Sequence, residues 1–199
     1  EEYDFTLRES IRTRTFWLLA VGQAMAGLGM GAVGVHLFLH LEQGVGLSRT
    51  TAALVWSIAS MANIPSRLIG GFLGDRLPKR FVLGSAIAMM ALSHFILGLA
   101  RSFPVVLVYA VLYGIGWGAR TPVMNAMQGE YFGRKHQGII RGWLQSITTP
   151  VTIAAPVVAG LMADRLGDYR LIFVVLSFVS LGGAVMTFLA TPPKPPGRE

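Results

Sequence analysis

Two arginines stand inside long apolar stretches of this 199-residue chain, and their chemistry is the first clue to its function. Arg67 lies in the segment 50–74 and Arg120 in the segment 104–130. A guanidinium within a membrane costs at least about 2.5 kcal/mol on insertion scales, so it needs water, a partner or a ligand. Acidic residues lie only at the ends of the apolar segments. An anion would therefore complete the site, and the planar fork of arginine suits a carboxylate or a phosphate.

The first arginine belongs to a polar stripe. Trp56, Ser60, Asn63 and Arg67 are spaced i, i+4, i+7 and i+11, which places them on one face of a helix. Such a stripe within a membrane faces protein or water rather than lipid. We therefore predict that these four residues bind substrate. The alternative is that Arg67, about 12 Å along the helix from Asp75, extends its side chain toward the membrane surface.

The second arginine follows two aromatic residues at helical spacing, Tyr113 and Trp117. Arg120 lies ten residues before Glu130, or about 15 Å along a helix, which is close to the middle of a membrane. We predict that Tyr113, Trp117 and Arg120 also line the substrate site. A simple helix contact, with the guanidinium stacked on Trp117, is the alternative.

The segment 140–163 offers further polar candidates. Gln145 and Thr149 share a helical face, and Pro150 and Pro156 interrupt the hydrogen-bond ladder near them. Bent helices commonly flank transport cavities. We therefore predict that Gln145 and Thr149 contribute to substrate binding.

A histidine in the first apolar segment is the candidate for proton coupling. His36 lies in a glycine-rich stretch, and an imidazole changes charge near neutral pH. It could equally serve as a contact between helices. His36 and His40 share a face, but two histidines without further ligands make a weak metal site. The sequence predicts no metal and no cofactor.

These residues must be positioned by membrane-spanning helices. The chain is 53% hydrophobic and 14% charged, with a mean hydropathy of +0.56. A span needs about 20 residues. Six apolar segments have that length, at about 16–40, 50–74, 81–100, 104–130, 140–163 and 171–190. A soluble fold is excluded because 199 residues cannot enclose six such helices in a polar shell. We predict an all-α, polytopic membrane protein, with the nearly uniform segments 81–100 and 171–190 as outer, lipid-facing helices.

The net charge of +7 is explained by orientation rather than by nucleic acid binding. Eleven of the 17 basic residues lie on one side of the predicted spans, four lie on the other, and Arg67 and Arg120 lie within. Positive residues concentrate on the cytoplasmic side. We therefore predict a multi-pass protein of the cell membrane with both termini in the cytoplasm, and a lipid bilayer but no nucleic acid among its partners.

An internal echo divides the spans into two sets of three. The pattern G-x-x-x-D-R-L begins at Gly71 and again at Gly160, at the end of the second span of each set. Three spans reverse the direction of the chain, so the second copy faces the opposite side. We predict a cytoplasmic linker at 1–15, a six-helix bundle at 16–190 with inverted repeats at about 16–100 and 104–190, and a cytoplasmic tail at 191–199.

The turn after the second span resembles a known family. It reads Gly71, Asp75, Arg76, Lys79 and Arg80 in the pattern G-x-x-x-D-R-x-P-K-R. This is similar to the signature loop between the second and third helices of a six-helix half in the major facilitator superfamily, with proline at position 78 where the family usually has glycine. The resemblance implies that these charges form a latch that holds one conformation, with Glu130 as a candidate partner of the arginines.

The lead-in D-F-T-L-R-E-S-I-R-T-R-T-F-W-L-L, from Asp4, resembles the start of the second half in oxalate/formate and monocarboxylate transporters. This resemblance implies a carboxyl-terminal half, present as a fragment and working with an amino-terminal six-helix half. It also implies that Arg67 contacts a substrate carboxylate. Asn63 stands where some relatives carry an acidic residue, which argues against proton coupling there. A self-standing six-helix protein that dimerises is the alternative.

The favoured function is secondary active transport of a small organic anion by alternating access. An intramembrane enzyme is disfavoured because the chain has no G-x-S-x-G, no H-E-x-x-H and no nucleophile with a base at workable spacing. A six-helix scaffold or sensor without transport activity is the remaining alternative.

Overall fold

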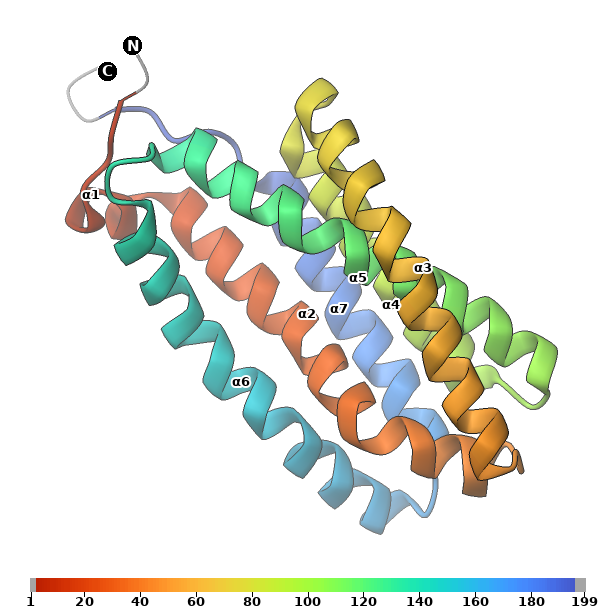
Figure 1. Ribbon diagram of the computed structural model, residues 1–199. Coiled ribbons are helices and arrows are strands. Elements are labelled where there is room, and N and C mark those ends of the chain that lie inside the picture. Colours follow the sequence, from red (N-terminus) through yellow and green to blue (C-terminus); the bar gives the residue numbers. More distant parts are fainter. Residues whose placement is uncertain (1–2, 196–199) are drawn as a thin grey trace.

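The computed structural model describes residues 3–195, and this part of the chain is all helical (Figure 1). The helices are α1 (Leu7–Arg12), α2 (Arg14–Leu39), the π-helical turn η1 (His40–Gly44), α3 (Arg49–Arg76), α4 (Lys79–Leu99), α5 (Phe103–Phe132), α6 (Gln137–Leu166) and α7 (Arg170–Leu189). The all-α prediction is confirmed. The long helices α2 to α7 match the six predicted segments and extend several of them by a turn or more.

Within residues 3–195, five of the six long helices are long and apolar enough to cross a membrane. The sixth, α3, has the length, with 28 residues, but does not meet that standard of composition. Of the six predicted spans, α3 is thus the one whose composition is less apolar than that of the others. The reason is the polar stripe that ends at Arg67, together with the charged residues at both helix ends.

The helices pack as two three-helix units, α2 to α4 and α5 to α7. Each contact between the units has an equivalent contact in which the two units exchange roles. Helix α3 of the first unit packs on α5 of the second, and α6 of the second packs on α2 of the first. Helices α4 and α7 pack on each other. In addition, α4 packs on α5, and α7 packs on α2. Figure 1 shows α3 and α6 on opposite flanks, with α2 and α7 between them and α5 crossing α3. The predicted bundle of two inverted repeats is confirmed by this arrangement.

Small residues bring the exchanged helices close together. A methyl group added at Gly114 would collide with the backbone carbonyl of Ala59, and one at Gly118 would collide with that of Asn63. These contacts fix α5 against α3. Small residues four apart allow such close approach in membrane proteins, where packing rather than water drives helix association.

The contact between α2 and α6 on the other flank also depends on small residues. Gly27 and Gly31 of α2 both lie against Thr152 of α6, so closely that neither has room for a side chain. The two first helices of the repeats, α2 and α5, thus each carry a pair of glycines that receives the second helix of the opposite repeat. Because close contact of this kind requires a small residue, the glycines determine which helices become neighbours.

The position of α4 differs from the sequence prediction of an outer helix. It is the most buried of the candidate spans, because it packs on both α5 and α7, and α6 is the least buried. Helix α7 does carry an exposed apolar face that suits contact with lipid, as expected. The flanking helices α3 and α6 therefore expose more of their surface in this chain than α4 does.

The predicted linker 1–15 contains a helix that the sequence interpretation missed. Thr6 and Glu9 form a capping box at the start of α1, and the hydrogen bond from the backbone N–H of Thr6 lowers the pKa of the Glu9 carboxyl. The linker is docked, because the N–H of Phe5 donates to the carbonyl of Phe132 at 2.9 Å and the Phe5 ring is buried. Residues 1–2 and 196–199 of the predicted linker and tail lie outside the described residues.

Candidate functional site

A cleft of about 170 Å³ lies between α2, α5 and α6. It extends from the middle of α5 toward the turn between α5 and α6, and most of its lining residues are polar. The lining residues are Gln23, Arg120, Thr121, Met124, Asn125, Gln128, Arg141, Leu144, Gln145 and Thr148. Two of the predicted binding residues, Arg120 and Gln145, are among them.

Arg120 is held at this cleft by residues of α2. Its Nε and Nη2 donate to Oε1 of Gln23, at 2.9 and 2.6 Å, and Nη1 lies 2.9 Å from the sulfur of Met30. No carboxylate pairs with Arg120 among residues 3–195. These neutral partners orient the guanidinium but leave its charge uncompensated, which favours an anion beside it.

Two buried amide atoms at the cleft also lack partners within the described chain. Gln23 is 5% exposed and its Nε2 makes no hydrogen bond, while Gln128 is 4% exposed and its Oε1 accepts none. Buried polar atoms are nearly always satisfied, so such atoms indicate a place for water or a ligand. The orientation of Gln23 is fixed by the two bonds from Arg120 to its oxygen, which leaves a donor free.

The cleft includes polar residues that the sequence interpretation overlooked. Thr121, Asn125 and Gln128 of α5 are spaced i, i+4 and i+7, as are Arg141, Gln145 and Thr148 of α6. These helical spacings are the sequence pattern from which a polar face on each helix could have been predicted. Thr149, which we predicted instead of Thr148, is exposed and does not line the cleft.

Arg67, the other intramembrane arginine, lies outside this cleft. Its side chain is exposed on α3, and its Nε donates to Oδ1 of Asn63 at 2.9 Å. Asn63 itself is buried, and its Nδ2 has no partner among residues 3–195. The polar cleft therefore lies beside Arg120 and not beside Arg67. The predicted contact of Arg67 with substrate stays a prediction.

The two predicted stripes do meet through their aromatic residues. The ring of Trp56 lies 5.9 Å from that of Trp117 and 6.3 Å from that of Tyr113, between centroids. Tyr113 is buried, and the two tryptophans and Ser60 are partly buried. This cluster accounts for Trp56, Tyr113 and Trp117 as contacts between α3 and α5. Their role in substrate binding stays a prediction.

The predicted latch is only partly connected in this structure. Lys79 forms an ion pair with Glu130, joining the start of α4 to the end of α5. Asp75, Arg76 and Arg80 make no ion pair among residues 3–195. The partner of Glu130 is thus Lys79 rather than one of the arginines. Gly71, also part of the predicted latch, is not required by close packing, because a Cβ there would meet open space.

His36 connects two helices. Its Nε2 lies 2.8 Å from the carbonyl oxygen of Pro156, and its ring lies 5.1 Å from that of Tyr169. Because a carbonyl only accepts, Nε2 must carry the proton in this contact. The contact favours a packing role for His36, and proton coupling stays a prediction.

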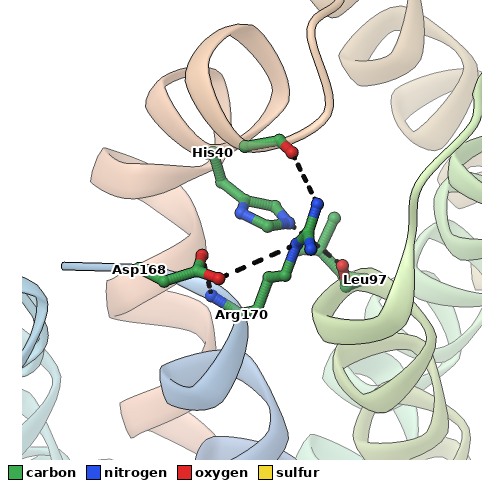
Figure 2. A network of polar contacts seen from close by, with 5 residues as sticks. His40, Leu97, Asp168 and Arg170 are labelled. Carbon is green, nitrogen blue, oxygen red and sulfur yellow. Dashed lines mark hydrogen bonds and ion pairs between the residues drawn. The ribbon is translucent and has the colours of Figure 1, made fainter. Parts of the chain in front are cut away.

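A polar network closes the end of the bundle opposite the termini (Figure 2). Arg170 of α7 donates through Nη2 to the carbonyl of Gly44 at 2.8 Å and lies 3.9 Å from the carboxylate of Asp168. Nε2 of His40 lies 3.0 Å from the carbonyl of Leu97. This network ties η1, α4 and α7 together. Residues 3–195 contain no cluster of three or more residues that could hold a metal.

Comparisons with known proteins agree with this architecture. Residues 19–199 match the family model described as the Major Facilitator Superfamily. The chain is 30% identical to monocarboxylate transporter 13 of Rattus norvegicus, over 75% of this chain and 35% of that protein. It is 28% identical to monocarboxylate transporter 11 of Homo sapiens, over 86% and 38% respectively.

A bacterial relative carries a different name. The chain is 26% identical to the 3-(3-hydroxy-phenyl)propionate transporter of Escherichia coli, over 57% of this chain and 28% of that protein. The chain thus spans little more than a third of the length of the curated relatives it matches. The predicted resemblance to monocarboxylate transporters is confirmed, as is the prediction that the family is not one of enzymes. With six long helices in two inverted repeats and a family match over residues 19–199, this multi-pass membrane chain belongs to the major facilitator superfamily.

Proposed function

We propose that the chain forms part of a secondary active transporter that carries a small organic anion, most simply a carboxylate, across the membrane. The observation that carries the proposal is the guanidinium of Arg120, which lines a polar cleft without a carboxylate partner among residues 3–195. An anion bound there would neutralise the charge and accept a hydrogen bond from the free Nε2 of Gln23. The names of the relatives, which denote carriers of organic acids, support the same class of cargo.

Transport by alternating access requires a second half that rocks against this one. The proposed partner is another six-helix half or a second copy of the chain. The flanks support this, because α3 exposes Met61, Ile64 and Leu68 beside the charged Arg67. A surface that carries an intramembrane arginine is costly to present to lipid, so a protein or a water-filled cavity should face it. Both termini are assigned to the cytoplasm by the distribution of basic residues.

Arg67 is proposed as a second anchor, on the face toward the partner half. Replacing it with glutamine should lower uptake of a labelled monocarboxylate into sealed vesicles by at least roughly tenfold, since a charge-assisted hydrogen bond contributes about 1.5–3 kcal/mol. Lysine at this position keeps the charge but loses bidentate geometry, so it should restore part of the uptake. Normal accumulation by both variants would remove Arg67 from the binding site.

The charged turn after α3 is proposed as a latch for one conformation. Replacing Asp75 with asparagine should slow turnover severalfold while leaving the affinity for the anion unchanged, because Asp75 lies about 12 Å along α3 from Arg67 and does not line the cleft that contains Arg120. The test compares the maximal rate and the half-saturating concentration of uptake. An unchanged rate would rule out the latch, and a changed affinity alone would place Asp75 in binding instead.

A further inference from the structure

A second cavity, unrelated to the anion cleft, lies between α3, α4 and α5. Its volume is about 470 Å³, roughly three times that of an engineered cavity that holds one benzene molecule. It runs along α3 from Ala62 to Leu77, a length of about 22 Å at helical rise. The hydrocarbon region of one leaflet is about 15 Å thick, so the groove is long enough to hold an extended acyl chain.

The residues that line this groove are too apolar to hold ordered water. It is built from apolar side chains such as Ile69, Leu73 and Met89, and its hydroxyls are those of Ser66 and Ser85. The hydroxyl of Ser66 already donates to the carbonyl of Ala62 at 2.6 Å. Ordered water needs two to four polar partners, which this surface does not offer. The occupant should therefore be apolar.

The charged end of the groove identifies the occupant more closely. Leu77 and Phe81 line that end, and each is next in sequence to an arginine, Arg76 and Arg80. The guanidinium of Arg80 lies 4.8 Å from the centre of the Phe81 ring, and that of Arg76 lies 4.0 Å from the centre of the ring of Phe72. Neither arginine has an ion-pair partner among residues 3–195, in contrast to Lys79 nearby. Two guanidinium groups without ion-pair partners, on residues next to those that end an apolar groove, suit a phosphate with an acyl chain attached.

We propose that this groove binds an anionic phospholipid, with one acyl chain along α3 and α4 and the phosphate between Arg76 and Arg80. An apolar helix of another protein would fill the groove but would leave both charges unpaired. The site lies on a different part of α3 from the stripe that ends at Arg67, since the groove and that stripe share no residue. The proposal is therefore independent of the cargo and of the anion cleft.

The test measures which lipids stay bound to the purified full chain. The protein is placed in nanodiscs of equal parts phosphatidylglycerol and phosphatidylcholine, extracted gently, and its retained lipids are identified by native mass spectrometry. Wild-type protein should retain phosphatidylglycerol in preference to phosphatidylcholine. The double variant Arg76→Gln, Arg80→Gln should weaken that retention about 30-fold, because each basic side chain near an anionic surface contributes about fivefold.

A second variant tests the groove itself. Ser85→Phe should also abolish preferential retention, because Ser85 is an exposed groove residue whose hydroxyl makes no hydrogen bond among residues 3–195, and the added ring would occupy the space of the acyl chain. Two matched controls should behave as wild type: Arg134→Gln with Lys135→Gln, which removes the same charge from the exposed α5–α6 turn, and Val185→Phe on the exposed face of α7. Equal loss in the controls, or full retention by Ser85→Phe, would overturn the proposal.

Discussion

Uptake of a carboxylate is expected to fall by at least about 30-fold when Arg120 is replaced by glutamine, because loss of a charged, hydrogen-bonded partner costs about 2–5 kcal/mol. The measurement is accumulation of labelled 3-(3-hydroxyphenyl)propionate and of short aliphatic monocarboxylates in sealed vesicles that contain the protein with this chain. Arg120→Lys keeps the charge but cannot reproduce both bonds to Oε1 of Gln23, so an intermediate loss is expected.

The control for this prediction is Arg101→Gln. Arg101 is exposed in the turn between α4 and α5, so its replacement removes the same charge at a distance from the cleft. It should leave uptake unchanged. Because loss of Arg120 also releases Gln23, each variant is checked for monodispersity and thermal unfolding before transport is compared. Uptake by a folded Arg120→Gln protein at the wild-type rate would contradict the assignment.

A single methyl group at Gly118 is expected to disrupt the bundle. The added Cβ would collide with the backbone carbonyl of Asn63, and neither helix can move without opening the α3–α5 contact. Overpacking of this kind costs about 1–3 kcal/mol even where side chains can adjust, and a backbone obstacle should reach the upper end of that range. Gly118→Ala should therefore lower the midpoint of thermal unfolding or prevent accumulation of folded protein.

The same substitution at Gly34 provides the control. A Cβ there would meet open space, and alanine is favoured over glycine within a helix by about 1 kcal/mol. Gly34→Ala should be neutral or stabilising, so the two variants are expected to shift the unfolding midpoint in opposite directions. A Gly118→Ala protein as stable as wild type would show that α3 and α5 are not held in this close contact.

The sequence was sufficient to predict the six long helices, because each apolar segment ends at charged residues or at a turn. It was also sufficient for the inverted repeat, since the echo at Gly71 and Gly160 reflects two equivalent helices. The composition of α3 and the burial of α4 were harder to predict. Hydropathy describes each segment alone, whereas burial depends on which neighbours a helix acquires.

The geometry of the candidate site was even harder to predict from the sequence than the burial of the helices. Helical spacing indicated which residues share a face, and the apolar segments around Arg67 and Arg120 made both arginines candidates for the site. The spacing could not reveal that Arg120 would meet Gln23, because that contact joins helices distant in the sequence. The predicted contact of Arg67 with a substrate carboxylate came from a family resemblance, while the cleft beside Arg120 is formed by the pairing of α2, α5 and α6. The helix α1 was missed although its capping box, Thr6 with Glu9, is visible in the sequence.

The most direct test of the central claim is binding of matched acids and amides to the purified protein. Thermal unfolding is followed with propionate and propionamide, and with 3-phenylpropionate and its amide, for wild type and for Arg120→Gln. A ligand at 100 times its dissociation constant stabilises the folded state by about 2.7 kcal/mol. We predict that wild type is stabilised by an acid but not by its amide, and that Arg120→Gln is stabilised by neither. Equal stabilisation of the two proteins by the acid, or of wild type by acid and amide alike, would contradict the account.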